Sequence, residues 1–206
     1  MNEWEKYYQL AQKKFQNHTA ILIQDSDRFT IIDFRNRDGR VDYYINFIVD
    51  KKRGSLIVSG DLGDSIATWF NPIEIKDLKR YIYKDIPYYM SKFQCTTDDY
   101  YYDEEYVFEC LIDGLFGAED GQEERIEDYV LNSSYSNVQA FKDELMYEVR
   151  DSIRNNDFIP TDRLYEMATD VYQDAWELFN KCGAQIDGRV YLWAIGFYMA
   201  CSQLNM

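Results

Sequence analysis

Apolar positions near the start of the chain recur at the spacing of one face of a helix. Trp4, Tyr8, Ala11 and Phe15 fall on such a face, which predicts a short amphipathic helix over residues 3–16. The period then changes, because β-branched and aromatic runs alternate with clusters of turn residues. These runs predict five strands of an antiparallel meander, at residues 20–24, 29–34, 41–49, 55–60 and 65–70.

The third of these runs alternates most clearly between two faces. One face carries Val41, Tyr43, Ile45, Phe47 and Val49, and the residues between them, from Asp42 to Ile48, form the other. Such alternation is expected when one face of an antiparallel sheet is covered. The N-terminal helix is the expected cover.

Helical periodicity returns after Asn71-Pro72 and predicts helices at residues 73–84, 86–93, 104–116, 122–131, 136–155, 162–182 and 190–204. The run 86–93 is short enough to fit a strand as well, and we favour a helix. The last helix contains no charged residue, so it is expected either at the buried centre of the helical half or in an oligomer interface. Burial within the chain is the favoured interpretation.

The order of these elements predicts a fold of the α+β class. Residues 1–72 would form a helix with a five-stranded antiparallel sheet. Residues 73–206 would form an acidic helical region packed on that sheet as one compact unit.

Composition excludes a disordered chain, since 46% of the residues are hydrophobic and 17% are aromatic. The sequence has no signal-peptide pattern and no apolar run of the ~18–20 residues that a bilayer requires, which predicts a protein that stays in the cytosol of the cell that makes it, without a membrane partner. The four cysteines form no C-x-x-C pair and His18 is the single histidine, so we interpret the thiols as small apolar side chains and predict no zinc site and no cofactor.

Charge is spread unevenly along the chain, whose net charge is −15. Residues 1–97 carry 13 acidic and 15 basic side chains, whereas residues 98–206 carry 24 and 7. A surface of one sign repels nucleic acid and attracts basic protein grooves. The sequence therefore predicts a protein partner and no direct contact with nucleic acid.

The acidity is densest in residues 98–128, which hold 13 carboxylates and one basic residue, Arg125. One interpretation is that these carboxylates imitate the charge row of a nucleic-acid backbone and occupy a groove lined with Lys and Arg. Tyr100, Tyr101, Tyr102 and Tyr106 would then add rigid contact area. The other interpretation is a solvated acidic face that keeps the protein soluble, and the two remain open.

Catalytic and metal chemistry find weaker support. A cation site could be formed by Asp98, Asp99, Asp103 and Glu105. However, the sequence has no loop of the D-x-D-x-D-G type that would orient these carboxylates toward one ion. No pattern of the Gly-x-Ser-x-Gly type occurs, and His18 lies in an expected turn. We therefore predict no enzyme.

Two further features are interpreted as turns. Residues 59–65 are rich in Gly and Asp but match no phosphate-binding pattern, and an expected strand follows them. Basic clusters at residues 35–40 and 51–53 fall at hairpin tips, and a meander places successive tips at opposite ends of the sheet. They are not expected to form one groove.

Two segments resemble acidic inhibitors of host defence that bacteriophages and prophages of Gram-positive bacteria encode, including anti-CRISPR proteins. They are the sheet segment from Gly54 to Asp64 and the acidic segment 98–128, about a third of the chain. The resemblance implies a partner such as Cas9 with its guide RNA, which holds nucleic acid in a positively charged channel.

These observations combine into the hypothesis of a phage-type inhibitor that binds a Cas9-like effector and blocks its binding of DNA. The expected contact residues are Asp98, Asp99, Tyr101, Asp103, Glu104, Glu105, Glu109, Asp113, Glu119, Asp120, Glu123, Glu124, Glu127 and Asp128. Two alternatives stay open. One is a structural or regulatory phage protein, homo-oligomeric through its apolar C-terminal helix, and the other is a metal-dependent enzyme that uses residues 98–105.

Overall fold

The computed structural model describes residues 3–117, 121–180 and 182–206. Its fold is mixed α+β, as the sequence predicts. The chain divides into two compact units, one formed by residues up to 99 together with 187–206, and the other by residues 100–186. We call the first the sheet unit and the second the acidic unit. This division differs from a boundary at residue 72, because the C-terminal segment returns to the unit that the N-terminal half forms.

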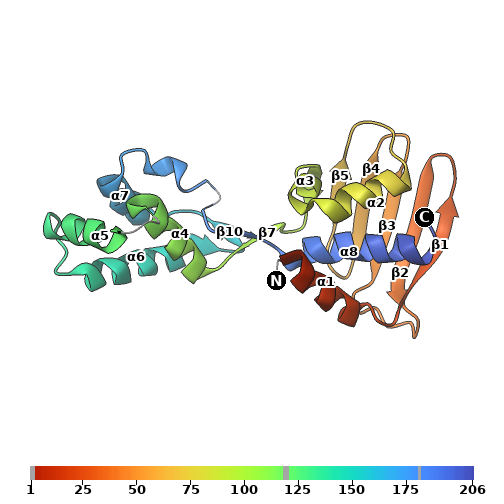
Figure 1. Ribbon diagram of the computed structural model, residues 1–206, viewed down its shortest axis with the longest axis horizontal. Helices are drawn as coiled ribbons and strands as arrows, with labels where there is room; N and C mark the ends of the chain where they lie inside the picture. The colour runs from red at the N-terminus through yellow and green to blue at the C-terminus, as the bar shows by residue number, and fades with distance from the viewer. Residues whose placement is uncertain (1–2, 118–120, 181) are drawn as a thin grey trace. The chain divides into compact units, whose positions relative to one another are not determined.

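A six-stranded antiparallel sheet, in which neighbours in sequence pair with each other, forms the base of the sheet unit (Figure 1). Its strands are β1 (His18–Asp25), β2 (Phe29–Asn36), β3 (Ile45–Asp50), β4 (Ser55–Gly60), β5 (Ser65–Thr68) and β6 (Phe93–Thr96). The first five lie where strands were predicted, and the sixth was not predicted.

The sixth strand begins inside a run that was predicted as a helix. Residues 86–90 form the short helix α3 (Ile86–Met90), whose first turn is capped by a hydrogen bond of 2.9 Å from Tyr88 N to the Asp85 carboxylate. Lys92 N then donates to Tyr89 O and Phe93 opens β6. The helix prediction was wrong for the end of this run, because eight mostly apolar residues fit a buried helix and a strand equally well.

The third strand is shorter than its alternating pattern predicts, since β3 begins only at Ile45. Val41 is 73% exposed, and the backbone N–H of Tyr43 donates to the Asp61 carboxylate at 2.8 Å. Tyr43 has a φ of 57°, which interrupts the extended chain. The Asp61 carboxylate, in the turn after β4, therefore holds the backbone at Tyr43 outside the strand, although the alternation alone predicts a strand from residue 41.

Three helices cover one face of the sheet: α1 (Glu3–Lys14), α2 (Ile75–Lys84) and α8 (Gly188–Gln203). α8 contacts β1, β2 and β3, with α1 and α2 on its two sides, and α3 also contacts it (Figure 1). Side chains from both layers form the core, as where Phe47 meets Phe197 edge to face at 5.2 Å. The prediction that the N-terminal helix covers the sheet is incomplete, because the last helix covers more of it.

Burial of α8 within the chain, the favoured interpretation, is confirmed, but its expected place at the centre of the helical half is wrong. All residues from Val190 to Phe197 are buried within the sheet unit. The helix is apolar all round because it faces the sheet on one side and two helices on the others. Gly196 permits a close approach of α8 to β3, since a Cβ there would lie 3.0 Å from Cδ1 of Ile45.

His18, the single histidine, is 1% exposed at the start of β1. Its ring packs against Phe15 and Phe34, and Nε2 donates to the carbonyl of Tyr43 at 3.1 Å. Nδ1 has no partner among the described residues. Burial lowers the pKa of His18 below its usual 6.5, although the Tyr43 carbonyl favours the protonated ring.

Acidification is therefore expected to destabilise the sheet unit through His18. The pKa of His18 is lower in the folded chain than its value of 6.5 in the unfolded chain. Between these two pKa values the unfolded chain binds more protons, so the free energy of unfolding decreases as the pH drops from 6.5 toward the folded-state pKa. The slope is at most about 1.4 kcal/mol per pH unit. Urea unfolding at pH 7.5 and pH 5.5 measures it, with His18→Gln as the control that loses this slope. Equal slopes in both proteins would contradict the assignment.

Helices dominate the acidic unit. It contains α4 (Glu104–Phe116), α5 (Gln122–Leu131), α6 (Val138–Ser152), α7 (Asp162–Val171) and a 3-10 turn η1 (Ala175–Glu177). Two small antiparallel pairs join β7 (Tyr100–Tyr102) to β10 (Ala184–Ile186) and β8 (Ile153–Arg154) to β9 (Asp157–Phe158). The predictions for 104–116 and 122–131 are confirmed at both ends.

Two predicted helices of this unit are longer than the real ones. α6 stops at Ser152 because Asn155 and Asn156 both take positive φ, the turn that a two-residue β-hairpin needs. The helix predicted for 162–182 ends at Val171, although Ala175 is still fully buried. Apolar residues at helical spacing fill the core there without continuing the α-helix, so the prediction was wrong for residues 172–180 and 182, and Lys181 lies outside the described residues.

One apolar core holds the acidic unit together. Phe141 of α6 is fully buried and meets Phe116, Tyr129 and Tyr135 at centroid distances of 5.8, 5.4 and 5.2 Å. Val107, Leu111, Leu145, Val149 and Leu164 complete the centre of this core. α4 and α5 therefore pack on α6 through their apolar sides, which leaves their other sides to water.

The thiols of the chain are free. Burial raises the pKa of Cys182 and of Cys201 to about 12, which keeps both protonated at neutral pH. Cys95, by contrast, is exposed on β6. None of the described helices is long and apolar enough to span a bilayer.

Candidate functional site

The fourteen residues predicted to contact a partner are distributed over both units. Asp98 and Asp99 end the first segment of the sheet unit, and Glu119 and Asp120 lie outside the described residues. The other ten belong to β7, α4, α5 and the Asp103 cap of α4: Tyr101, Asp103, Glu104, Glu105, Glu109, Asp113, Glu123, Glu124, Glu127 and Asp128. The structure thus groups ten of the predicted residues on one unit.

Division into units sharpens the charge asymmetry. The acidic unit contains 21 of the 37 acidic residues of the chain and 6 of the 22 basic ones. The sheet unit has 16 of each, so the whole net charge of −15 belongs to the acidic unit. The near-neutral half that the sequence suggested is in fact a neutral unit that includes the C-terminal helix.

On α4 the carboxylates form a stripe. Glu105, Glu109 and Asp113 are all exposed and follow one another at four-residue spacing, opposite the buried Val107 and Leu111. Successive carboxylates of the stripe rise about 6 Å along the helix axis. One DNA strand carries a charge every ~3.4 Å of axis, so α4 alone is less dense than a nucleic-acid backbone.

α5 adds a second group of exposed carboxylates. Glu123 and Glu127 are one pair at four-residue spacing, and Glu124 and Asp128 are another. Gln122, the first residue of α5, donates from Nε2 to the Asp113 carboxylate at 2.9 Å, so α5 begins beside the end of the α4 stripe. The two helices together present a broader acidic surface than either does by itself.

Only some of these carboxylates have a cationic partner. Glu104 pairs with Arg150 and Glu123 pairs with Lys142, both at 2.7 Å. Asp103 is occupied as the N-cap of α4, where it accepts from Tyr106 N at 3.0 Å. Within the described part of the chain, no Lys or Arg lies within ion-pair distance of Glu105, Glu109, Asp113, Glu124, Glu127 or Asp128.

The spacing of these carboxylates destabilises α4 and α5. Like charges four residues apart destabilise a helix by about 0.2–0.5 kcal/mol for each pair. Such pairs occur twice in the α4 stripe and twice on α5. Glu104 and Glu105 in the first turn of α4, and Glu123 and Glu124 in the first turn of α5, gain from the helix dipole. Stability of the fold therefore does not explain the carboxylates beyond these first turns, which are Glu109, Asp113, Glu127 and Asp128.

The tyrosines of the segment have different roles. Tyr101 donates its hydroxyl to Gln185 Oε1 at 2.6 Å, and Tyr102 packs against Phe158, so both support the β7–β10 pair and the core. Tyr106 is 44% exposed on α4, next to Glu105. Of the described tyrosines predicted as contact area, Tyr106 is the most available to a partner.

A cation site of the kind considered from the sequence has no counterpart in the described residues, where no three His, Cys, Asp or Glu side chains gather around a common point. The glycine-rich segment 59–65 is a tight turn between β4 and β5, as predicted. It lies beside the N-terminus of α8, but Asp187 already caps that helix by accepting from Arg189 N at 2.8 Å. The carboxylate of the cap occupies the place that an anion would need.

The basic clusters lie at opposite ends of β3, as predicted for alternate hairpin tips. Residues 37–44 join β2 to β3 and residues 51–54 join β3 to β4. Arg40 pairs with Asp38 at 2.9 Å, and Lys51 pairs with Asp25 at 2.9 Å. Each of these two cations is balanced by a neighbouring carboxylate of the same unit.

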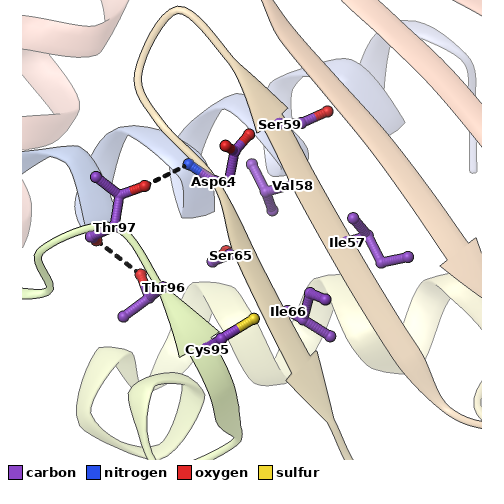
Figure 2. Close-up of a pocket in the computed structure, with 9 residues that line it drawn as sticks. All are labelled: Ile57, Val58, Ser59, Asp64, Ser65, Ile66, Cys95, Thr96 and Thr97. Atoms are coloured by element: carbon purple, nitrogen blue, oxygen red, sulfur yellow. Dashed lines mark hydrogen bonds between the residues drawn. The ribbon is translucent and has the colours of Figure 1, made fainter.

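Sequence reasoning missed a row of isoleucines across the uncovered face of the sheet. Ile31, Ile48, Ile57 and Ile66 pair in register across four adjacent strands, and Cys95 follows on β6. Figure 2 shows Ile57, Ile66 and Cys95 on this face, with the helices behind the sheet, at a shallow pocket of 330 Å³. The period-2 pattern of each strand places one isoleucine on this face, but only the register aligns them.

The edge that β1 forms in this sheet is partly closed by a side chain. Gln203 of α8 accepts from Ala20 N at 2.9 Å and donates to His18 O at 3.3 Å. Its amide occupies the donor and acceptor that a further strand would use at this point of β1. The exposed part of the edge, which includes Leu22 and Ile23, carries the register shift of a bulge.

A second pocket, in the acidic unit, was also missed. It lies where α5 ends and α6 begins, and it is bordered by Glu127 of the predicted surface and by Leu131, which is 81% exposed. Sequence offers one signal, an apolar residue at the end of a helix followed by the polar run from Asn132 to Asn137. That signal does not distinguish an exposed side chain from a buried one.

Comparison with protein-family models, with curated proteins and with solved structures finds no match to this chain. The resemblance of residues 54–64 and 98–128 to phage-encoded inhibitors therefore stays a prediction. The candidate site rests on the geometry and charge of the acidic unit.

Proposed function

We propose that this protein is a phage-type inhibitor that binds a nucleic-acid-handling bacterial defence effector, of the Cas9-like class, through the carboxylates of α4 and α5. The observation that carries the proposal is the placement of charge. The acidic unit holds the entire net charge of the chain, and six exposed carboxylates of its first two helices have no cation beside them within the described residues. A partner with Lys and Arg in a groove would supply those cations.

Charge complementarity of this kind acts mainly on the rate at which two partners associate. A one-signed surface raises the rate of association with an oppositely charged groove and excludes partners of the same sign, including nucleic acid itself. The α4 stripe is less dense than a DNA strand, so we propose competition for part of a basic channel and not a full copy of duplex charge. The neutral sheet unit would serve as the scaffold or contact a second surface.

The proposal is tested by binding to Cas9 with and without guide RNA, measured at low salt and near 0.15 M, followed by competition with target DNA. We expect binding that weakens with salt and that displaces DNA. The triple variant Glu105→Gln, Glu109→Gln, Asp128→Asn should weaken binding about tenfold, which corresponds to about 1.4 kcal/mol.

A matched triple variant removes equal charge elsewhere on the same unit: Asp170→Asn, Asp174→Asn, Glu177→Gln. These carboxylates are exposed on α7 and around η1, outside the predicted surface. We expect this control to retain at least half of the wild-type affinity. Equal losses in both triples would reject α4 and α5 as the site. Absence of binding under every condition would instead favour a structural or regulatory protein whose acidity serves solubility.

A further inference from the structure

The pocket between α5 and α6 has the form of an anchor site at the border of the acidic surface. Its volume is 440 Å³, within the range of pockets that hold small ligands or side chains. The residues that line it are Glu127, Val130, Leu131, Ser133, Tyr135, Ser136, Asn137 and Val138.

The apolar part of this pocket is exposed to an unusual degree. Leu131, the last residue of α5, is 81% exposed, and Val138 at the start of α6 is half-buried. Val130 below them is 7% exposed and belongs to the core. An aliphatic side chain that entered here would cover Leu131 and Val138 while resting on a packed base.

Local hydrogen bonds hold the pocket in shape. Asn137 caps α6 by accepting from Ala140 N at 2.9 Å, and Ser133 donates from Oγ to the carbonyl of Val130 at 2.9 Å. Tyr135 is fixed from both ends, since its ring meets Phe141 edge to face and its hydroxyl accepts from Arg163 at 3.3 Å. A preformed pocket loses little conformational entropy when a partner binds.

The electrostatic surroundings of the pocket favour a cation. Glu127 lines it, and the exposed Glu124 and Asp128 lie on the same helix. The negative pole at the end of α5 and the positive pole at the start of α6, where Asn137 and Val138 also line the pocket, offset each other, so the preference for a cation comes from the carboxylates. Two cations of the same unit are already engaged, because Lys142 pairs with Glu123 and Arg163 pairs with Glu144, each at 2.7 Å. Among the described residues no Lys or Arg pairs with Glu127 itself, so a partner would bring the positive charge.

We propose that this pocket docks a basic amphipathic segment of a partner protein, with one aliphatic side chain against Leu131 and Val138 and a Lys or Arg beside Glu127. The inference rests on the proposed function, which it deepens by naming the chemistry of the partner at one point of the acidic surface. Binding hot spots lie in well-packed, desolvated pockets whose surrounding contacts exclude water, and an aliphatic side chain against Leu131 and Val138 would form an anchor of this kind. The apolar contact in this pocket would add to the acidic surface an interaction that salt does not screen.

The test uses the full chain and synthetic fluorescent peptides, so it does not depend on Cas9. The first peptide carries Lys and Leu on opposite faces of about four helical turns. A second peptide replaces every Leu with Ser at the same charge, and a third replaces every Lys with Gln. Anisotropy titrations near 0.15 M salt compare the wild type with Leu131→Ser and Glu127→Gln. Ile159→Ser is the matched control, because Ile159 is 61% exposed in the same unit.

We expect the Lys/Leu peptide to bind at least about tenfold more tightly than either of the other two. Leu131→Ser and Glu127→Gln should each weaken its binding at least about threefold, while Ile159→Ser leaves it unchanged. Equal binding of the Lys/Leu and Lys/Ser peptides, or no effect of Leu131→Ser, would overturn the proposal. Charge would then account for the binding without an apolar anchor. Self-association of the chain that blocks peptide binding and disappears in Leu131→Ser would overturn it too, by naming a second copy as the occupant.

The two proposals fail separately. Binding of the Lys/Leu peptide at this pocket without any binding of Cas9 would retain the pocket and reject the effector. Binding of Cas9 that is sensitive to the α4 and α5 carboxylates and insensitive to Leu131→Ser would reject the pocket and retain the effector.

Discussion

Replacing Gly54 with alanine is expected to lower the free energy of unfolding by about 3–5 kcal/mol. Gly54 is buried at the end of the β3–β4 hairpin with a φ of +64°, a region that costs an L-residue about 1–2 kcal/mol. A Cβ at this position would overlap the carbonyl oxygen of Asn71 and lie 2.9 Å from its carbon. That backbone cannot withdraw freely, because Gly54 O also accepts from Trp69 N at 2.8 Å.

Gly39→Ala is the matched control for this prediction. Gly39 has a φ of +79° and nothing lies within 4 Å of an added Cβ, so only the conformational cost of about 1 kcal/mol applies. Urea unfolding of both variants separates the steric cost from the backbone cost. Similar losses in the two variants would show that the chain around Asn71 relaxes at little cost.

Phe141→Ala is expected to destabilise the acidic unit by about 3–5 kcal/mol. Phe141 is fully buried and makes three edge-to-face contacts that join α4, α5 and the loop before α6. Its loss would loosen the two helices that carry the exposed carboxylates. Hydrogen exchange should therefore accelerate in α4, α5 and α6, and the affinity for the Lys/Leu peptide should fall with it.

Tyr147→Ala provides the comparison on the same helix, since Tyr147 is 66% exposed and its loss should change stability by less than about 0.5 kcal/mol. Phe141→Leu keeps most of the buried volume and should cost less than the alanine variant. Normal hydrogen exchange of α4 and α5 in Phe141→Ala would contradict the role assigned to this side chain in supporting the acidic surface.

The division of charge between the units favours a binding role over a purely solubilising one. Solubility requires net charge but not its confinement to one unit, and it does not require repulsive pairs along one side of a helix. The sheet unit has equal numbers of acidic and basic residues and therefore carries no net charge. The contrast between the two triple variants decides whether the position of the carboxylates matters or only their number.

Several elements could be predicted from the sequence alone. The period-2 runs predicted five of the six strands of the large sheet, and the helical period predicted α4 and α5 at both ends. The concentration of carboxylates in residues 98–128 identified most of the candidate site by simple counting. These features are local, since alternation, helical period and charge density are properties of neighbouring residues.

Other features depended on contacts between distant parts of the chain. Nothing local in residues 188–203 indicates that they pack on a sheet formed by the first half, because an all-apolar helix fits any buried place. The alignment of Ile31, Ile48, Ile57 and Ile66 requires the register of four strands, and a shift of one residue would remove it.

Sequence by itself determined the fold class, most of the elements and the sign of the candidate surface. Tertiary structure alone decided which carboxylates have a cation beside them, that Tyr101 bonds to Gln185, and that Leu131 borders an open pocket. The physical reason is that charge and periodicity add up along the chain, whereas pairing and exposure depend on which distant side chains the fold brings within a few ångströms.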